Sequence, residues 1–216
     1  MMINKTQRSQ LDSRYRAMLV NSLSGFKSAN LLGTCNLDGH TNLAIISSVF
    51  HLGADPALVG FIMRPHTVQR DSLENILATG VYTLNHVNAD IWQQSHQTSA
   101  RYDANQSEFD EVGLTAHYLN ECNAPFVKQS RIKYSVELQS SQELVNGTQL
   151  VIGEIIDIHV NEELIKPDGY IDIEAAQTVA ISGLDGYHTT KQLGRLCYAK
   201  PNIDPQLLDD SHNDQA

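Results

Sequence analysis

The sequence predicts a mainly β fold: a closed or split Greek-key β-barrel accompanied by a few short helices. Most apolar segments are short, rich in β-branched residues and separated by turn residues, as strands are. Apolar residues at helical spacing occur only in a few short stretches. No internal repeat is present, and a length of 216 residues predicts one domain.

The composition excludes several classes of protein. A net charge of −10 argues against binding to nucleic acid, which requires a basic face. No apolar run approaches the length that spans a bilayer, and the N-terminus lacks the apolar core of a signal peptide, so we expect no membrane association. The 3 cysteines are scattered and predict neither a disulfide framework nor a zinc site. These features predict a cytoplasmic protein whose core needs no disulfides.

The two ends of the chain differ from its centre. We expect a mobile leader over residues 1–7, followed by an amphipathic helix over about 9–22 that serves as a packing or dimer element. From residue 202 the chain holds several aspartates and no lysine or arginine, which predicts a flexible acidic tail. The expected division is a helical leader (1–22), a barrel domain (23–200) and a tail (201–216).

Turn residues separate the predicted strands. Asp38-Gly39 and Asn146-Gly147 predict hairpin turns, and Asp55-Pro56 ends a strand and precedes an apolar one that should be buried on both faces. A long polar stretch over 88–123, with weak helical patches at 91–94 and 108–112, is expected to pass over a binding site. The predicted strands are 31–37, 41–52, 57–63, 81–87, 131–138, 143–145 and 149–160, and 170–182 mixes β and helical patterns.

A basic loop ahead of a helix is the first candidate site. Between residues 64 and 70 this acidic chain places Arg64, His66, Thr67 and Arg70. The next residues, 71–74, have the spacing of an N-terminal capping box, and Gly80 ends the helix. Positive side chains beside a helix N-terminus, whose free N–H groups favour anions, predict a phosphate site. A solvated basic loop is the alternative.

Polar residues within two neighbouring strands form the second candidate. Ser47 and Ser48 come late in one strand, and Asn85 and His86 lie at the end of another. Polar groups among apolar neighbours require hydrogen-bond partners, and a polar heterocyclic ligand with a phosphate tail would supply them. Alternatively, the two serines satisfy one another's backbone, and Asn85 caps a strand end.

At these residues the sequence resembles the flavin reductase-like family of FMN-binding split barrels, and within it the flavoredoxin-like branch. The order and spacing of the segments carry the resemblance over roughly residues 20–200. They are SSVF (47–50), GFIMRP (60–65), RDSLENI (70–76), YTLNHV (82–87), HQTSARYD (96–103), SEFDEVGLT (107–115), APFVKQSRIKYSVEL (124–138), TQLVIGEIIDIHV (148–160) and SGLDGYH (182–188). One departure is that the family's usual Lys-Asp-Thr helix start is Arg70-Asp71-Ser72 here.

The resemblance implies a homodimer with FMN as the cofactor, bound near the subunit interface. It implies that the backbone and hydroxyl groups of Ser47, Ser48 and Val49 line the isoalloxazine ring. It assigns Arg64, Thr67 and Arg70 to the phosphate, for which a guanidinium can donate two parallel hydrogen bonds. Asn85 and His86 would lie beside the ribityl chain or the ring edge. Thr98 and Ser99, in the segment 96–100, would close over the cofactor, either in the same subunit or from the second one.

The resemblance also implies a choice between two functions. The first is an NAD(P)H-dependent flavin reductase, in which NADH or NADPH delivers a hydride to flavin N5. The second is a flavoredoxin-like FMN electron carrier without NAD(P)H activity of its own, reduced by a partner; an electron-acceptor protein could serve either. Because the flavin carries the chemistry, no catalytic side chain is predicted. No Rossmann, P-loop, zinc or serine-hydrolase motif is present, and a pyridoxamine-phosphate oxidase or haem-handling split barrel fits the quoted segments less well.

Overall fold

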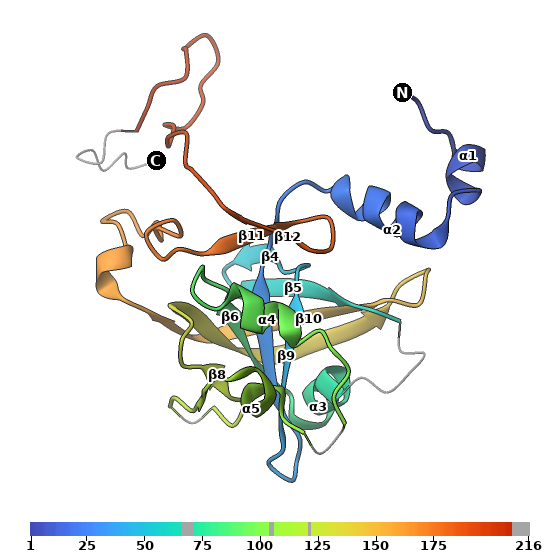
Figure 1. The fold of residues 1–216 in the computed structure, drawn as a ribbon. Helices are drawn as coiled ribbons and strands as arrows, with labels where there is room; N and C mark the ends of the chain where they lie inside the picture. The colour runs from blue at the N-terminus through green and yellow to red at the C-terminus, as the bar shows by residue number, and fades with distance from the viewer. Residues whose placement is uncertain (66–70, 104–105, 121, 209–216) are drawn as a thin grey trace.

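The structure is a computed structural model that describes residues 1–65, 71–103, 106–120 and 122–208. Its centre is a seven-stranded antiparallel sheet in the order β3-β2-β6-β9-β10-β5-β4, which curls into a split barrel (Figure 1). This arrangement confirms the predicted mainly β class. The strands are β2 (Asn30–Cys35), β3 (Thr41–Ile46), β4 (Phe50–Ala54), β5 (Ala57–Met63), β6 (Val81–His86), β9 (Ile132–Glu143) and β10 (Gln149–Val160).

The barrel interior is filled by alternate residues of these strands, because successive side chains of a strand point to opposite faces. One buried cluster includes Leu32, Phe61, Tyr82, Val136 and Val151. The outer face of β2 is buried as well, since Leu31 belongs to a second cluster that packs against helices and the small upper sheet. Strand β2 is therefore buried on both faces.

The strand that the sequence predicted to be buried on both faces, 57–63, is only buried on one. In β5 the side chains of Val59, Phe61 and Met63 are buried, whereas those of Leu58 and Ile62 on the other face are half-buried. This part of the prediction was wrong because an apolar run does not reveal which of its faces another layer covers.

Two further small sheets and several short helices complete the fold. One sheet has the order β1-β11-β12 and lies above the barrel in Figure 1, and the other pairs β7 with β8. The strands are β1 (Lys27–Ser28), β7 (Ala116–His117), β8 (Phe126–Val127), β11 (Val179–Ser182) and β12 (Gly186–Thr189). The helices near the barrel are α3 (Asp71–Thr79), α4 (Trp92–Gln97), α5 (Glu108–Val112) and the 3-10 helix η1 (Glu162–Leu164).

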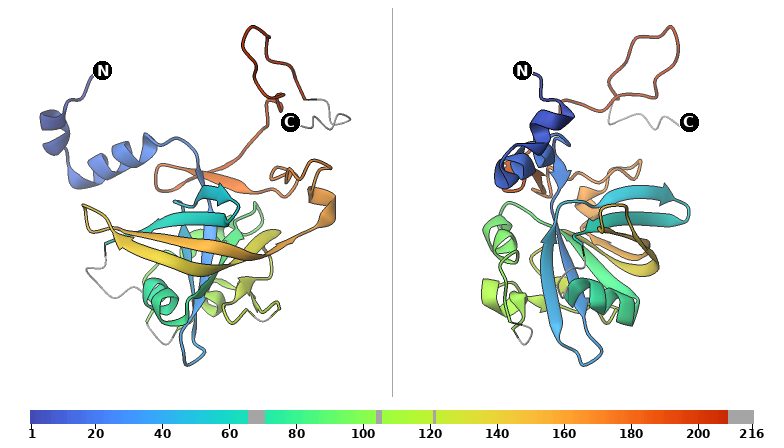
Figure 2. Two further views of the ribbon diagram at one scale, coloured as in Figure 1. Left: turned by 180° about the vertical axis from the view of Figure 1, so that it is seen from behind. Right: turned by 90° about the vertical axis from the view of Figure 1, so that its right-hand side faces the viewer.

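The N-terminal region forms two helices, α1 (Lys5–Ser9) and α2 (Ser13–Ser22), instead of a leader and one longer helix. The side chain of Asp12 accepts hydrogen bonds from the N–H groups of Arg14 and Tyr15, so it caps a new helix where we expected a continuous one. Both helices stand away from the barrel (Figure 2). No helix in the described part of the chain is long and apolar enough to cross a membrane.

The expected strand over 41–52 is interrupted at residues 47–49. Strand β3 ends at Ile46, the last residue that pairs with β2, and β4 begins at Phe50, which pairs with Gly60 of β5. The chain therefore leaves one edge of the sheet and joins the opposite edge within three residues, 47–49. We call these residues the corner.

Candidate functional site

The corner is held to the barrel by the hydroxyl group of Ser48. The Ser48 Oγ donates a hydrogen bond to the Ile62 carbonyl at 2.9 Å and accepts one from the Ile62 N–H at 3.0 Å. Ser48 faces Ile62 in a continuation of the register that pairs Phe50 with Gly60, so its side chain extends the ladder where the backbone no longer does. The hydroxyl of Ser48 is thus occupied by the protein, as in the structural alternative, although its partner is β5 and not Ser47.

Side chains of the polar stretch 88–123 bind the outer edge of β3. The Ile45 N–H donates to Thr98 Oγ1 and the Leu43 N–H donates to Glu108 Oε2, each at 2.9 Å. Alternate N–H groups of a strand point the same way, so the next one on this edge belongs to Ser47. Ser47 has no hydrogen-bond partner among the residues that the structure describes. The corner therefore presents one open backbone donor.

Val49 is half-buried and packs against the barrel cluster, so it contributes an apolar surface to the corner. Its carbonyl accepts a hydrogen bond from the Ser28 hydroxyl at 3.1 Å. An apolar side chain next to an open donor is the combination that holds a flat heterocycle with a polar edge.

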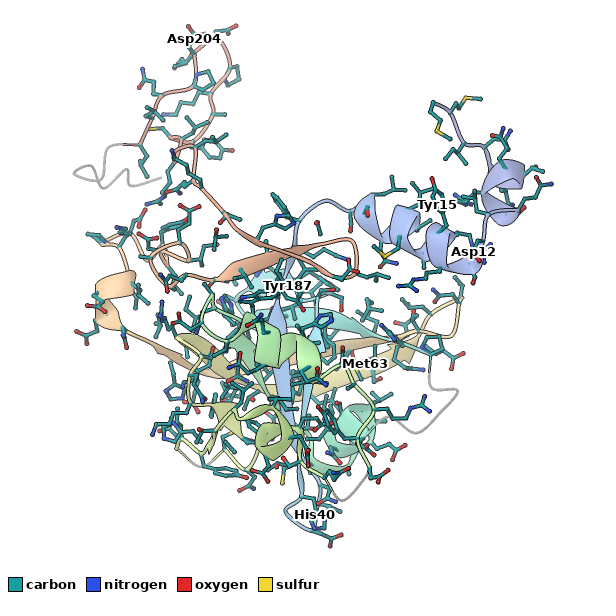
Figure 3. The ribbon with its side chains drawn as sticks, in the orientation of Figure 1. Asp12, Tyr15, His40, Met63, Tyr187 and Asp204 are labelled. Carbon is teal, nitrogen blue, oxygen red and sulfur yellow. The ribbon has the colours of Figure 1, made fainter. Side chains whose placement is uncertain are left out.

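Arg64 provides an exposed positive charge close to the corner. It is the first residue after β5, two positions beyond the Ile62 that binds Ser48, and Figure 3 labels its neighbour Met63 at the end of that strand. Thr67 and Arg70 lie outside the described residues. Helix α3 begins at Asp71, which the predicted capping box placed at the N-cap, so the helix starts one residue earlier than that box requires. Gly80 follows the helix with a φ of 74° as expected.

Asn85, which the resemblance places beside the cofactor, uses its side-chain amide within the protein. Its side chain is fully buried, its amide donates to the Leu31 carbonyl and to Thr83 Oγ1, and its oxygen accepts from the Val127 N–H. These three bonds join β2, β6 and β8 through one side chain. Asn85 thus links neighbouring strands and does not cap a strand end, as the structural alternative had it.

His86 is half-buried at the end of β6. Its Nδ1 lies 3.3 Å from the Thr178 hydroxyl, and its ring meets that of Tyr134 edge-on. Burial lowers the pKa of His86 to about 4, so the ring is neutral at pH 7. No ligand-facing role of His86 follows from this geometry.

The residues of the segment 96–100 take two different positions. Thr98 is 4% exposed and its hydroxyl links the Ile45 N–H to the Ser95 carbonyl, whereas Ser99 is exposed. Thr98 therefore contacts β3 of its own chain. Nearby, the Tyr187 hydroxyl lies 3.0 Å from His96 Nδ1, and the Trp92 ring lies 5.3 Å from that of Tyr187. Figure 3 places Tyr187 above α4.

Sequence reasoning did not identify Glu108 as a residue of this region. Burial raises the pKa of its carboxyl group, and it reaches Leu43 across 65 positions of the sequence. No local sequence pattern predicts such a contact, because an Asp or Glu in the first turn of a helix usually interacts with the N-terminus of that helix alone.

An acidic hollow of about 360 Å³ lies on the side of α3 nearest the turn between β2 and β3. Its walls include five carboxylates: Asp38, Asp71, Glu74, Asp103 and Glu108. Like charges repel a phosphate, so this hollow does not fit an anionic cofactor. Within the described ranges no group of three or more His, Cys, Asp or Glu side chains could hold a metal ion.

Comparison with known proteins identifies the fold and the family. The domain described as "Flavin reductase like domain" matches residues 23–178. A candidate flavin reductase with a split barrel domain from Shewanella frigidimarina NCIMB 400 is 56% identical, with a TM-score of 0.89 over 92% of this chain and 100% of that one.

Two more distant structures share the fold. The nitrilotriacetate monooxygenase component B of Bacillus cereus is 19% identical, with a TM-score of 0.81 over 91% of this chain and 98% of that one. The flavoredoxin of Desulfovibrio vulgaris (Miyazaki F) is 21% identical, with a TM-score of 0.68 over 82% and 92% of the two chains. With more than half of its length matched by the domain, this chain belongs to the flavin reductase-like family of split-barrel proteins.

Proposed function

We propose that the protein is a flavin reductase that binds FMN at the corner of residues 47–49 and accepts a hydride from NADH or NADPH. The observation that carries this proposal is the open Ser47 N–H at the end of an edge whose two preceding N–H groups are both bound. The isoalloxazine ring has two carbonyl oxygens and two unprotonated nitrogens along its polar edge, and these atoms accept hydrogen bonds. A flavin therefore matches the donor that the corner presents.

The residues around the corner fit the other parts of FMN. Val49 offers an apolar surface to the ring, and Arg64 carries an exposed charge that suits the phosphate. We retain Thr67 and Arg70 as further phosphate ligands and Ser99 as a residue beside the cofactor. When bound, FMN would supply the redox chemistry by taking a hydride at N5, while the protein binds it, orients its ring and neutralises its phosphate.

We further propose that the functional unit is a homodimer. Helices α1 and α2 bury no residue and project from the barrel together with the C-terminal segment (Figure 2). Large apolar side chains on these projecting parts are exposed, among them Tyr15 (54%), Leu23 (77%) and Leu193 (101%). Exposed apolar groups gathered on projecting segments favour a partner surface, and a second copy of the chain fits that role.

A second function, an FMN electron carrier without NAD(P)H activity, is favoured by one observation. Ser48, Asn85 and Thr98 use their polar side-chain groups within the protein. This leaves few side-chain donors near the corner for a second ligand such as a nicotinamide. Such a carrier would receive electrons from a protein partner.

The two functions are separated by an anaerobic absorption spectrum of the purified protein with FMN, before and after NADH or NADPH is added. A reductase would show flavin bands that bleach on mixing. Bands that persist until dithionite is added would indicate the carrier. A protein that binds no flavin after incubation with FMN would contradict both functions and the assignment of the corner.

A further inference from the structure

The edge of β3 is closed by side chains where a neighbouring strand would otherwise lie. β3 is the last strand of the sheet, so its outward N–H groups have no ladder partner. Thr98 Oγ1 takes the N–H of Ile45, and Glu108 Oε2 takes that of Leu43. These two acceptors come from separate elements, the end of α4 and the start of α5. Together they imitate two rungs of a missing strand.

Both acceptors are themselves fixed in place. The Thr98 hydroxyl donates to the Ser95 carbonyl at 2.8 Å while it accepts from Ile45, so both of its hydrogen-bonding directions are defined. Beside Glu108, the Ser107 hydroxyl bonds the Thr41 hydroxyl at 2.7 Å, which fastens the start of α5 to β3 a second time. The two rungs therefore constrain the position of the strand edge.

The third position on this edge is the open N–H of Ser47. On one side it follows the rung between Ile45 and Thr98, and on the other it precedes the two bonds that join Ser48 to Ile62. Its donor direction is thus set from both sides before any ligand arrives. Preorganised donors bind more strongly because no ordering cost remains when the ligand binds.

We propose that Thr98 and Glu108 are positioning residues that aim the Ser47 N–H at the hydrogen-bond-accepting edge of the flavin ring, which makes the flavin the third rung of the side-chain ladder on β3. The inference rests on the proposed flavin site. It gives Thr98 a role through β3 in place of direct contact with the cofactor. Hydrogen bonds to a flavin ring tune its electronic properties, so the ladder should influence the spectrum and the reduction potential of bound FMN as well as its affinity.

The test replaces the rung closest to Ser47. Thr98→Val keeps the shape of the side chain but removes the acceptor of the Ile45 N–H, and Thr98→Ser restores it. The matched control is Ser95→Ala, because Ser95 is also buried in α4 and its hydroxyl bonds the Ile91 carbonyl, without touching β3. For each protein we would measure the Kd for FMN, the absorption spectrum and reduction potential of bound FMN, and the Tm.

We expect Thr98→Val to bind FMN roughly five- to tenfold more weakly than the wild type, the effect of one misplaced hydrogen bond, and to shift the flavin absorption bands. Thr98→Ser should return both to the wild-type values. Ser95→Ala should lower the Tm and leave Kd, spectrum and potential unchanged. If Thr98→Val does not fold, Glu108→Ala tests the second rung, with Glu108→Gln as its rescue because the amide oxygen still accepts from Leu43.

The outcomes separate this inference from the function on which it rests. A wild-type protein that binds FMN, together with a Thr98→Val protein of identical affinity, spectrum and potential, would overturn the ladder and leave the flavin site intact. The same loss of FMN affinity in Ser95→Ala would also overturn it, since general loosening of α4 would then explain the result. A wild-type protein that binds no FMN would overturn the proposed function itself.

Discussion

The ends of β3 and β6 carry polar residues that look alike in the sequence, yet the structure uses them differently. At the end of β6 the side chain of Asn85 is fully buried and makes three hydrogen bonds within the protein. At the end of β3 the hydroxyl of Ser48 is also bound, but the backbone N–H of Ser47 has no partner in the described part of the chain. We call the end of β6 the closed end, because the Asn85 side chain is fully bonded within the protein. We call the end of β3 the open end, because the Ser47 N–H has no partner among the described residues.

This difference teaches that a polar residue indicates a ligand only when some of its hydrogen-bonding capacity remains unused. A buried polar group must be paired, and pairing inside the protein satisfies it as well as pairing with a ligand does. Substitutions at the closed end should therefore affect stability, and substitutions at the open end should affect binding.

The largest effect is expected for Asn85→Ala. This change leaves the buried Val127 N–H without its partner and removes the side-chain bond to the Leu31 carbonyl, which keeps its backbone pairing with residue 85. It should lower the free energy of unfolding by about 2–4 kcal/mol. Urea denaturation would measure it. Asn42→Ala is the matched control, because the side chain of half-buried Asn42 makes a single bond to the described residues, to Ser72, and its loss should cost about 1 kcal/mol. Equal losses in the two variants would show that the bonds of Asn85 stabilise the fold no more than the bond of Asn42 does.

Arg64→Ala should act on binding and leave stability nearly unchanged, since Arg64 is exposed. Loss of a charge-assisted hydrogen bond to the phosphate should weaken FMN binding by roughly 1.5–3 kcal/mol, measured by titration calorimetry. Arg14→Ala removes the same charge from exposed α2 and should leave the affinity as it is. Unchanged FMN affinity in Arg64→Ala would exclude Arg64 as a phosphate ligand.

His86 should make the closed end sensitive to acid. Because burial lowers its pKa from 6.5 to about 4, the unfolded chain takes up a proton that the folded chain rejects. The neutral His86 therefore costs the folded protein no stability above pH 6.5. Below pH 6.5 the free energy of unfolding decreases as the pH falls towards 4. Between pH 7 and pH 5 the wild type should lose about 1–2 kcal/mol more than His86→Gln.

Chemical denaturation at the two pH values measures the His86 effect. The exposed His51 provides the control, because His51→Gln should lose as much stability in acid as the wild type. If His86→Gln and the wild type lost the same amount, the neutral state of His86 would not contribute to folding.

The sequence was sufficient for the elements whose signals are local. Asp38-Gly39, Asn146-Gly147 and Gly80 mark turns and a helix end that the structure contains, and alternation along β10 gave a strand close to its observed bounds. The family could be recognised from the order and spacing of these short segments along the chain.

What the sequence could not supply depends on contacts between distant segments. The break at the corner was missed because Ser47, Ser48 and Val49 are compatible with a continuing strand, and only the pairing with β2 on one side and β5 on the other reveals the change of edge. The hydrogen bonds of Asn85 to Val127 and of Thr98 to Ile45 could not be predicted, because these partners are more than 40 positions away. Which polar groups remain open is a property of the folded chain.

The side-chain ladder on β3 also bears on how the protein avoids aggregation. An uncovered edge strand can pair with the edge of another molecule and nucleate intermolecular β-sheet. Because Thr98 and Glu108 occupy the outward N–H groups of Ile45 and Leu43, β3 offers no continuous row of free donors to a neighbouring chain. The opposite edge, β4, is short and interrupted by a register shift between His51 and Gly53. A split barrel, which has two edges where a closed barrel has none, is thereby protected from polymerising through either of them.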